Sequence, residues 1–134
     1  MDNEQLIREA IGVAYNAYAP YSSYNVGAAL LSDSNKVYTG CNIENSSFSA
    51  TNCAERTAFF KAISEGERRF KKIAIVAFKN DKIDKNVTPC GICRQVMSEF
   101  CDDNFTILTA ISETEYNSYM LKDLLPNCFS KDNF

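Results

Sequence analysis

Two cysteines separated by two residues stand in the stretch TPCGICRQV, residues 88–96. Cys90 and Cys93 are three positions apart, so in a helix they would share one face. Thiolates are favoured at a helix N-terminus, because unpaired N–H groups and the helix dipole lower the thiol pKa there. Taken alone, the pair fits a thioredoxin-like redox couple, half of a structural zinc knuckle, or part of a catalytic metal site.

A third cysteine, Cys53, stands in the stretch NCAERTAFF, at the expected start of the only other helix that follows a loop from the sheet. Three cysteines at two helix starts make a poor structural zinc site, because closed sites use four protein ligands. A catalytic zinc site keeps three protein ligands and leaves the fourth position to water. The pattern therefore favours a catalytic centre held by Cys53, Cys90 and Cys93.

The composition restricts which residue can move protons. The chain has no histidine, which is the commonest general base and metal ligand, so Ser-His-Asp and Cys-His catalysis are excluded. Glu55 is the candidate proton shuttle, provided that Cys53 lies at or just outside the helix boundary, so that both reach one centre. The stretch also fits a capping box, with Asn52 as the cap and Glu55 as its partner.

The charge of such a centre requires compensation. Three thiolates on a divalent cation leave a net charge of about −1, which would keep the pKa of a bound water high. Arg56 and Arg94, each near a ligand cysteine in the sequence, are candidates to supply positive charge. Each also fits an ordinary surface position on a helix.

Length and composition indicate a single domain over residues 1–134. Hydrophobic residues make up 46% of the chain and charged residues 23%, which are globular proportions. No apolar run approaches the roughly 18 residues of a membrane span, and the polar start MDNEQLIREA resembles no signal peptide, so we expect a cytoplasmic protein. The net charge of −3 argues against a nucleic-acid partner.

The spacing of apolar residues predicts an α/β fold. Helices are expected at residues 2–18, 53–65 and 89–100, a hairpin within 26–43, further strands at 72–78, 105–110 and 116–121, and a loop at 81–89. Thr88 is the expected cap of the third helix, with Pro89 in its first turn, and Gly66 the expected end of the second. The order α-β-β-α-β-α-β-β predicts a three-layer α/β/α sandwich around a five-stranded mixed sheet.

Longer segments resemble a known family. The elements C-A-E and P-C-x-x-C resemble the signature of zinc-dependent nucleoside deaminases, with Cys53 where many relatives carry histidine. The segments APYSSYNVGAAL, GCNIEN, CAERTAFFKAISEG and PCGICRQVMSEF, with the tail LLPNCFS, are similar to the small homotetrameric cytidine deaminases. The resemblance covers about residues 5 to 130. It implies their fold and the hydrolysis of cytidine and 2′-deoxycytidine to uridine and 2′-deoxyuridine, with release of ammonia, in pyrimidine salvage.

The resemblance also implies a role for each residue of the centre. Cys53, Cys90 and Cys93 would bind one zinc ion per subunit. Glu55 would take a proton from the zinc-bound water, whose hydroxide attacks C4 of the cytosine ring, and would then protonate N3 and the departing amino group, as zinc deaminases do. Arg56 would neutralise the ligand thiolates.

For the substrate, the resemblance implies contacts outside the centre. Asn42 and Glu44 would hydrogen-bond the ribose, and the backbone of Ala54 would help to fix the base. Tyr24 matches an aromatic residue beside the nucleoside that is usually phenylalanine in the family. Phe129 would reach into the pocket of a neighbouring subunit of a homotetramer and stack on the base.

Three other functions fit parts of the pattern. A deaminase of the blasticidin S type shares the C-A-E and P-C-G-x-C-R-Q elements, although the PYSSYNVGAAL and NIEN segments favour ribose recognition. A redox protein without metal would use Cys90 and Cys93 as a reversible disulfide and leaves Cys53 and Glu55 unexplained. A zinc-stabilised interaction module would bind the metal without catalysing a reaction.

Overall fold

The computed structural model describes residues 1–134. The elements in chain order are α1 (Asn3–Ala14), β1 (Tyr24–Ser32), β2 (Val37–Cys41), α2 (Ala54–Ser64), β3 (Phe70–Lys79), β4 (Lys82–Ile83), α3 (Gly91–Phe100), β5 (Thr106–Ala110), β6 (Tyr116–Met120) and α4 (Leu121–Leu124). Two short 3₁₀ helices span Phe48–Ala50 and Lys131–Asn133. No helix is both long enough and apolar enough to cross a membrane.

The sheet is mixed, with the strand order β2-β1-β3-β5-β6. Strand β1 runs antiparallel to both β2 and β3, β3 and β5 are parallel, and β6 is antiparallel to β5. Helix α3 lies between β3 and β5 in the sequence and supplies the crossover connection that a parallel pair requires. These five strands are the predicted mixed sheet.

A sixth strand, β4, lies where a loop was predicted at residues 81–89. It pairs with the end of β3, with Phe78 opposite Ile83. Asn80 and Asp81 turn the chain back, with φ angles of 52° and 60°, as a tight hairpin turn requires. Only two residues pair, so the segment lacks the alternating pattern by which a strand is recognised.

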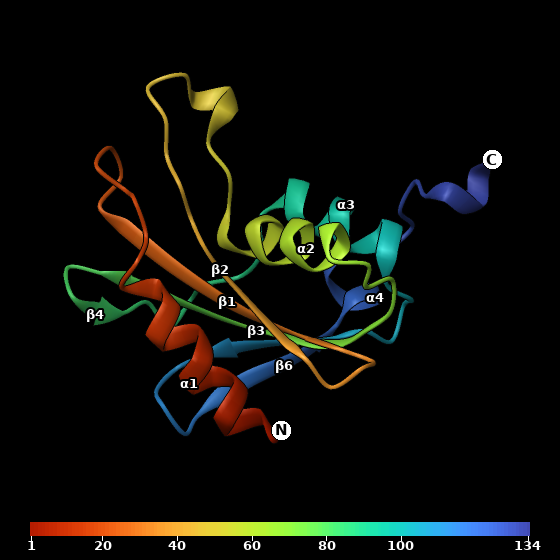
Figure 1. Ribbon diagram of the computed structural model, residues 1–134, viewed down its shortest axis with the longest axis horizontal. Coiled ribbons are helices and arrows are strands. Elements are labelled where there is room, and N and C mark those ends of the chain that lie inside the picture. Colours follow the sequence, from red (N-terminus) through yellow and green to blue (C-terminus); the bar gives the residue numbers. More distant parts are fainter.

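The helices form layers on the two faces of the sheet (Figure 1). On β1, Ala29 and Leu31 point toward α1, whereas Ala28 and Leu30 point toward α2 and α3. Strand β3 alternates in the same way, because successive side chains of a strand face opposite sides. Two apolar clusters result, one on each face, and the predicted three-layer α/β/α architecture is confirmed.

Helix α1 spans 12 residues and ends four residues before the predicted end at residue 18. Its start is as expected, since Asp2 and Gln5 form a capping box. The helix ends at Ala14, and Tyr15 and Tyr18 lie beyond it with 77% and 57% of their surface exposed. The backbone of Tyr18 pairs instead with the extended chain after β2, through a 3.0 Å hydrogen bond to the carbonyl of Asn42. Tertiary pairing overrides the apolar periodicity there.

Close packing of β2 against α2 fixes the start of that helix. A Cβ atom on Gly40 would lie 2.5 Å from the carbonyl oxygen of Ala54 and 2.5 Å from the nitrogen of Ala58. Only glycine allows the strand to approach the helix backbone this closely. At the other end, Gly66 follows the last turn with a φ of 103°, as predicted for the end of this helix.

Candidate active site

The two predicted ligand helices begin at cysteines. Cys53 is the N-cap of α2 and Cys90 the N-cap of α3, and both have extended backbones with ψ angles of 157° and 167°. Neither side chain caps its helix, so both sulfurs are free to face a common centre. The cap of α3 is thus Cys90, two residues after the predicted cap Thr88. The first carbonyl that accepts an intrahelical bond is that of Cys90, from the nitrogen of Arg94.

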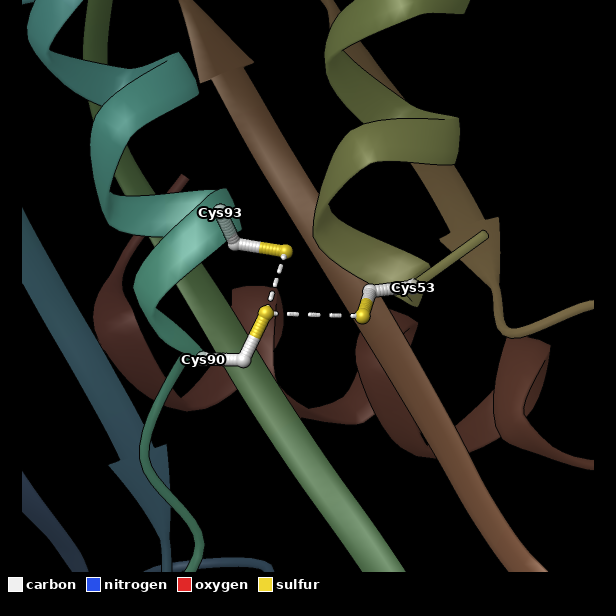
Figure 2. Close-up of side chains that lie close together, drawn as sticks. All are labelled: Cys53, Cys90 and Cys93. Carbon is white, nitrogen blue, oxygen red and sulfur yellow. Dashed lines mark hydrogen bonds between the residues drawn. The ribbon is translucent and has the colours of Figure 1, made fainter. Parts of the chain in front are cut away.

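The three cysteine sulfurs converge between these helix starts (Figure 2). The Sγ atoms of Cys53 and Cys90 are 3.7 Å apart, those of Cys90 and Cys93 are 3.5 Å apart, and all three lie within 4.8 Å of one another. A tetrahedral zinc ion with Zn–S bonds of about 2.3 Å would hold its sulfurs about 3.8 Å apart. The donor set and its spacing therefore fit zinc, with one position left open.

The alternative of a capping box over residues 52–55 is not observed. The side chain of Asn52 donates to the hydroxyl of Thr57 at 3.1 Å, and the helix begins one residue later than that box requires. Cys53 thus occupies the boundary position that allows it to share a centre with Glu55.

Arg56 supplies positive charge to the cysteine cluster. Its Nη2 donates to the Sγ of Cys53 at 3.2 Å, and its buried Nε has no protein partner. Arg94 has different partners: its Nε donates to the carbonyl of Pro89 at 2.7 Å, and its Nη1 to that of Leu124 at 2.8 Å. The second of these bonds ties α3 to α4, and the charge-compensating role of Arg94 stays a prediction.

The pKa values of the Cys53 and Cys93 thiols are shifted in opposite directions. Hydrogen bonding from Cys93, and further bonding from Arg56 and Cys90, lower the pKa of the Cys53 thiol. The same interaction with Cys53, together with burial, raises the pKa of the Cys93 thiol. A thiolate held beside further thiols is the form that binds a metal cation.

Glu55 lies in the first turn of α2 with 4% of its surface exposed. Burial raises the pKa of its carboxyl to about 7, against an opposing backbone hydrogen bond, and the nearby Cys53 thiolate adds to the increase. A carboxyl of this kind exchanges protons near neutral pH, which general acid–base catalysis requires.

A cavity of about 390 Å³ opens beside the cysteine cluster and is lined by 13 residues. It brings together five of the predicted substrate and catalytic residues: Tyr24, Asn42, Glu44, Ala54 and Glu55. A volume of this size suits a small molecule. Cys53 and Cys90 also line the cavity, so its contents would lie against the centre.

Asn42 and Glu44 are held in place by the backbone around the cavity. Asn42 accepts from the nitrogen of Val26 at 2.9 Å and donates to the carbonyl of Tyr24 at 2.8 Å. Glu44 accepts from the nitrogens of Tyr21 and Ser22 at 2.9 and 3.1 Å, and from the hydroxyl of Ser22. Hydrogen bonding from Ser22 lowers the pKa of Glu44, so the cavity wall holds a carboxylate.

Phe129 does not line this cavity. It lies on the C-terminal tail, which extends away from the sheet beyond α3 (Figure 1), and 62% of its surface is exposed. Its carbonyl accepts a 2.8 Å bond from Gln95, and its ring meets that of Phe134 edge to face at 5.7 Å.

Sequence reasoning missed the cavity wall formed by the segment before Cys90. Val87 and Thr88 line the cavity, and Asp84 accepts a 2.6 Å hydrogen bond from the hydroxyl of Tyr24. The signal available was the position of this segment, since residues that lead directly into a ligand cysteine must lie beside the centre.

The family described as the cytidine and deoxycytidylate deaminase zinc-binding region matches residues 1–109. Cytidine deaminase from Sporosarcina psychrophila is 47% identical over 133 residues, which cover 99% of this chain and 95% of that protein. The crystal structure of cytidine deaminase from Burkholderia pseudomallei has a TM-score of 0.86 at 39% identity, covering 96% of this chain and 100% of that one. The predicted family and its fold are therefore confirmed.

The rival family is a weaker match. Blasticidin-S deaminase from Bacillus cereus is 31% identical over 91 residues, which cover 65% of each chain. Similarity to cytidine deaminases extends over nearly the whole chain, including the segments that precede the cysteines.

Proposed function

The chain belongs to the family of zinc-binding cytidine and deoxycytidylate deaminases, and from this premise we propose that it hydrolyses cytidine and 2′-deoxycytidine. The products are uridine or 2′-deoxyuridine and ammonia. One observation carries the proposal: of three sulfurs at zinc-binding distances, those of Cys53 and Cys90 line the same cavity as the buried carboxyl of Glu55. This is the constellation of a zinc-dependent hydrolytic deaminase.

The charge of the cavity favours a nucleoside over a nucleotide. Its charged side chains are the carboxyls of Glu44 and Glu55, and the rest of its polar lining consists of amides, hydroxyls and thiols. A substrate phosphate would meet like charge there, and like charges at short range disfavour binding. An uncharged ribose offers hydroxyls that a carboxylate can accept from.

Each residue of the cysteine cluster and its surroundings would have its own role in the reaction. Cys53, Cys90 and Cys93 would hold the zinc ion, which, when bound, lowers the pKa of a water ligand and so supplies the nucleophile. Glu55 would carry one proton of that water to N3 of the cytosine ring, and would later carry the second, from the hydroxyl formed at C4, to the departing amino group. Arg56 stabilises the thiolates through its bond to Cys53.

The substrate would be oriented by residues whose positions are already fixed. Asn42 and Glu44 would hydrogen-bond the ribose, and their bonds to the backbone hold them in place before the substrate enters. Tyr24 would pack beside the nucleoside, and the backbone of Ala54 would contact the base. Such preorganisation reduces the entropy lost on binding.

We further propose that the active unit is a homotetramer in which Phe129 stacks on the base in a neighbouring subunit. Support comes from the position of the tail: Phe129 is exposed and lies outside the cavity of its own chain. An exposed aromatic ring on a projecting segment suits insertion into a partner.

The biological setting is proposed on chemical grounds. Residues 1–134 would form one deaminase domain that acts in pyrimidine salvage, because the reaction converts one free nucleoside into another. The cytoplasm is the proposed location, since zinc binding requires reduced thiolates and that compartment keeps thiols reduced.

The first test follows the ultraviolet absorbance of cytidine after addition of the zinc-loaded protein. Loss of absorbance on the long-wavelength side of the cytosine band, at a rate proportional to protein, is the expected result. No change would refute the proposed activity. Blasticidin S assayed in parallel tests the rival deaminase, and a reversible Cys90–Cys93 disulfide without stoichiometric zinc would indicate the redox protein.

A further inference from the structure

Tyr24 presents its ring to the cavity and its hydroxyl to the segment beside it. The residue is half-buried at the start of β1 and lines the cavity. Its hydroxyl donates to the Oδ2 of Asp84 at 2.6 Å. The hydroxyl of Tyr24 is therefore bound within the protein.

Asp84 anchors the segment that runs from β4 to α3. Its nitrogen donates to the carbonyl of Ala77 on β3 at 2.8 Å, which fixes the segment to the sheet. Its Oδ1 accepts from the nitrogen of Asn86 at 3.0 Å, which closes a turn. The residue is half-buried, and hydrogen bonding from Tyr24 and then from Asn86 lowers its pKa, so the group is a carboxylate.

The anchored segment forms one wall of the cavity and leads into the cysteine cluster. Val87 and Thr88 line the cavity, and Cys90 follows two residues later. The bond between Tyr24 and Asp84 is thus a direct tie between this wall and the aromatic wall on β1. A hydrogen bond to a charged group is stronger than one between neutral groups, which suits it to hold two walls at a fixed separation.

We propose that Asp84 is a positioning residue for the substrate: through Tyr24 it sets the distance between the aromatic ring and the wall formed by Val87 and Thr88. The inference rests on the proposed function, because the cavity must be the nucleoside site. Asp84 acts without touching the substrate. Its effect falls on substrate affinity, since the tie holds the walls of the pocket and contributes no reacting group.

The test is a double-mutant cycle on the zinc-loaded enzyme with Tyr24→Phe, Asp84→Asn and the combined variant. Asparagine retains the oxygen that accepts from Asn86 and places an uncharged amide NH₂ group where Tyr24 now meets a carboxylate, so the charge-assisted bond donated by the Tyr24 hydroxyl is lost. Each single variant is expected to raise the KM for cytidine by roughly threefold to tenfold, the scale of one ordinary hydrogen bond, since the tie acts on the substrate only through the pocket walls. The KM of the combined variant should equal that of a single variant, because the two substitutions remove the same charge-assisted bond.

The turnover number and the zinc content should stay within about twofold of the wild type. Asp81→Asn is the matched control, since Asp81 is an exposed carboxylate in the turn before β4 and its φ of 60° suits asparagine. Effects on KM that multiply in the combined variant would overturn the inference. An unchanged KM in the single variants, with only a lower Tm, would overturn it as well. If the wild-type protein does not act on cytidine, the proposed function is refuted, and this result is distinct from the two that overturn the inference on Asp84.

Discussion

The guanidinium of Arg56 donates a hydrogen bond to the Sγ of Cys53 at 3.2 Å from one turn away on α2. The interaction places the positive group beside the sulfur that begins the helix, where it offsets the charge of a three-thiolate centre. Arg94, which directly follows Cys93 in the sequence, donates to backbone carbonyls instead. Proximity to a cysteine in the sequence thus did not decide which arginine contacts a sulfur.

Replacement of Arg56 with glutamine should weaken the centre. We expect a loss of about tenfold to a hundredfold in zinc affinity or turnover, the usual effect of removing a partner of a metal ligand. Chelator competition and steady-state kinetics measure the two quantities. Arg94→Gln is the matched variant: we expect it to lower Tm by loosening α4 and to keep zinc affinity. A comparable loss of zinc affinity in Arg94→Gln would establish charge compensation by both arginines.

Replacement of Glu55 with glutamine should separate metal binding from catalysis. The variant keeps the shape of a buried side chain but cannot exchange protons, so turnover should fall about 10²- to 10⁴-fold or more. Zinc content should stay at one ion per chain, because glutamine replaces no ligand. Glu65→Gln, an exposed change at the end of the same helix, should leave both unchanged. Full activity in Glu55→Gln would contradict the assigned proton shuttle.

Phe129→Ala tests whether the tail completes a neighbouring site. Loss of one stacking partner of the base should raise the KM by about tenfold, with zinc content unchanged. Mixed assemblies of Phe129→Ala and Glu55→Gln chains give a sharper test. If Phe129 acts on a neighbour, hybrid oligomers contain sites with both an intact Glu55 and an intact Phe129, and wild-type KM returns in part. Absence of recovery in mixed oligomers would show that Phe129 acts within its own chain or not at all.

The start of α2 was predictable because cysteine chemistry and helix geometry constrain one another. The sequence alone required Cys53 to lie at a helix boundary for Glu55 to share its centre, and the structure has it as the N-cap. The zinc-ligand set followed from the count of cysteines at helix starts and the absence of histidine. These inferences used local spacing, which a sequence records directly.

Contacts between distant segments were not predictable in the same way. The bond from Tyr24 to Asp84 joins residues 60 positions apart, and it forms because β4 turns the chain back along β3, whose other edge pairs with β1. The end of α1 at Ala14 likewise depends on pairing of Tyr18 with the chain after β2. No local periodicity encodes such pairings, since they depend on how complete elements pack.

Gly40→Ala tests how the sheet positions the centre. The added methyl group would lie 2.5 Å from the carbonyl oxygen of Ala54, so α2 must move away from β2, at a cost of about 1–3 kcal/mol in unfolding free energy. Because Cys53 begins this helix, zinc affinity should fall with stability, as chelator competition would measure. Gly12→Ala is the control: nothing lies within 4 Å of its new methyl group, and alanine in an exposed helix should stabilise by about 0.5–1 kcal/mol. Equal zinc affinity in the two variants would mean that the approach of β2 to α2 does not set the position of Cys53.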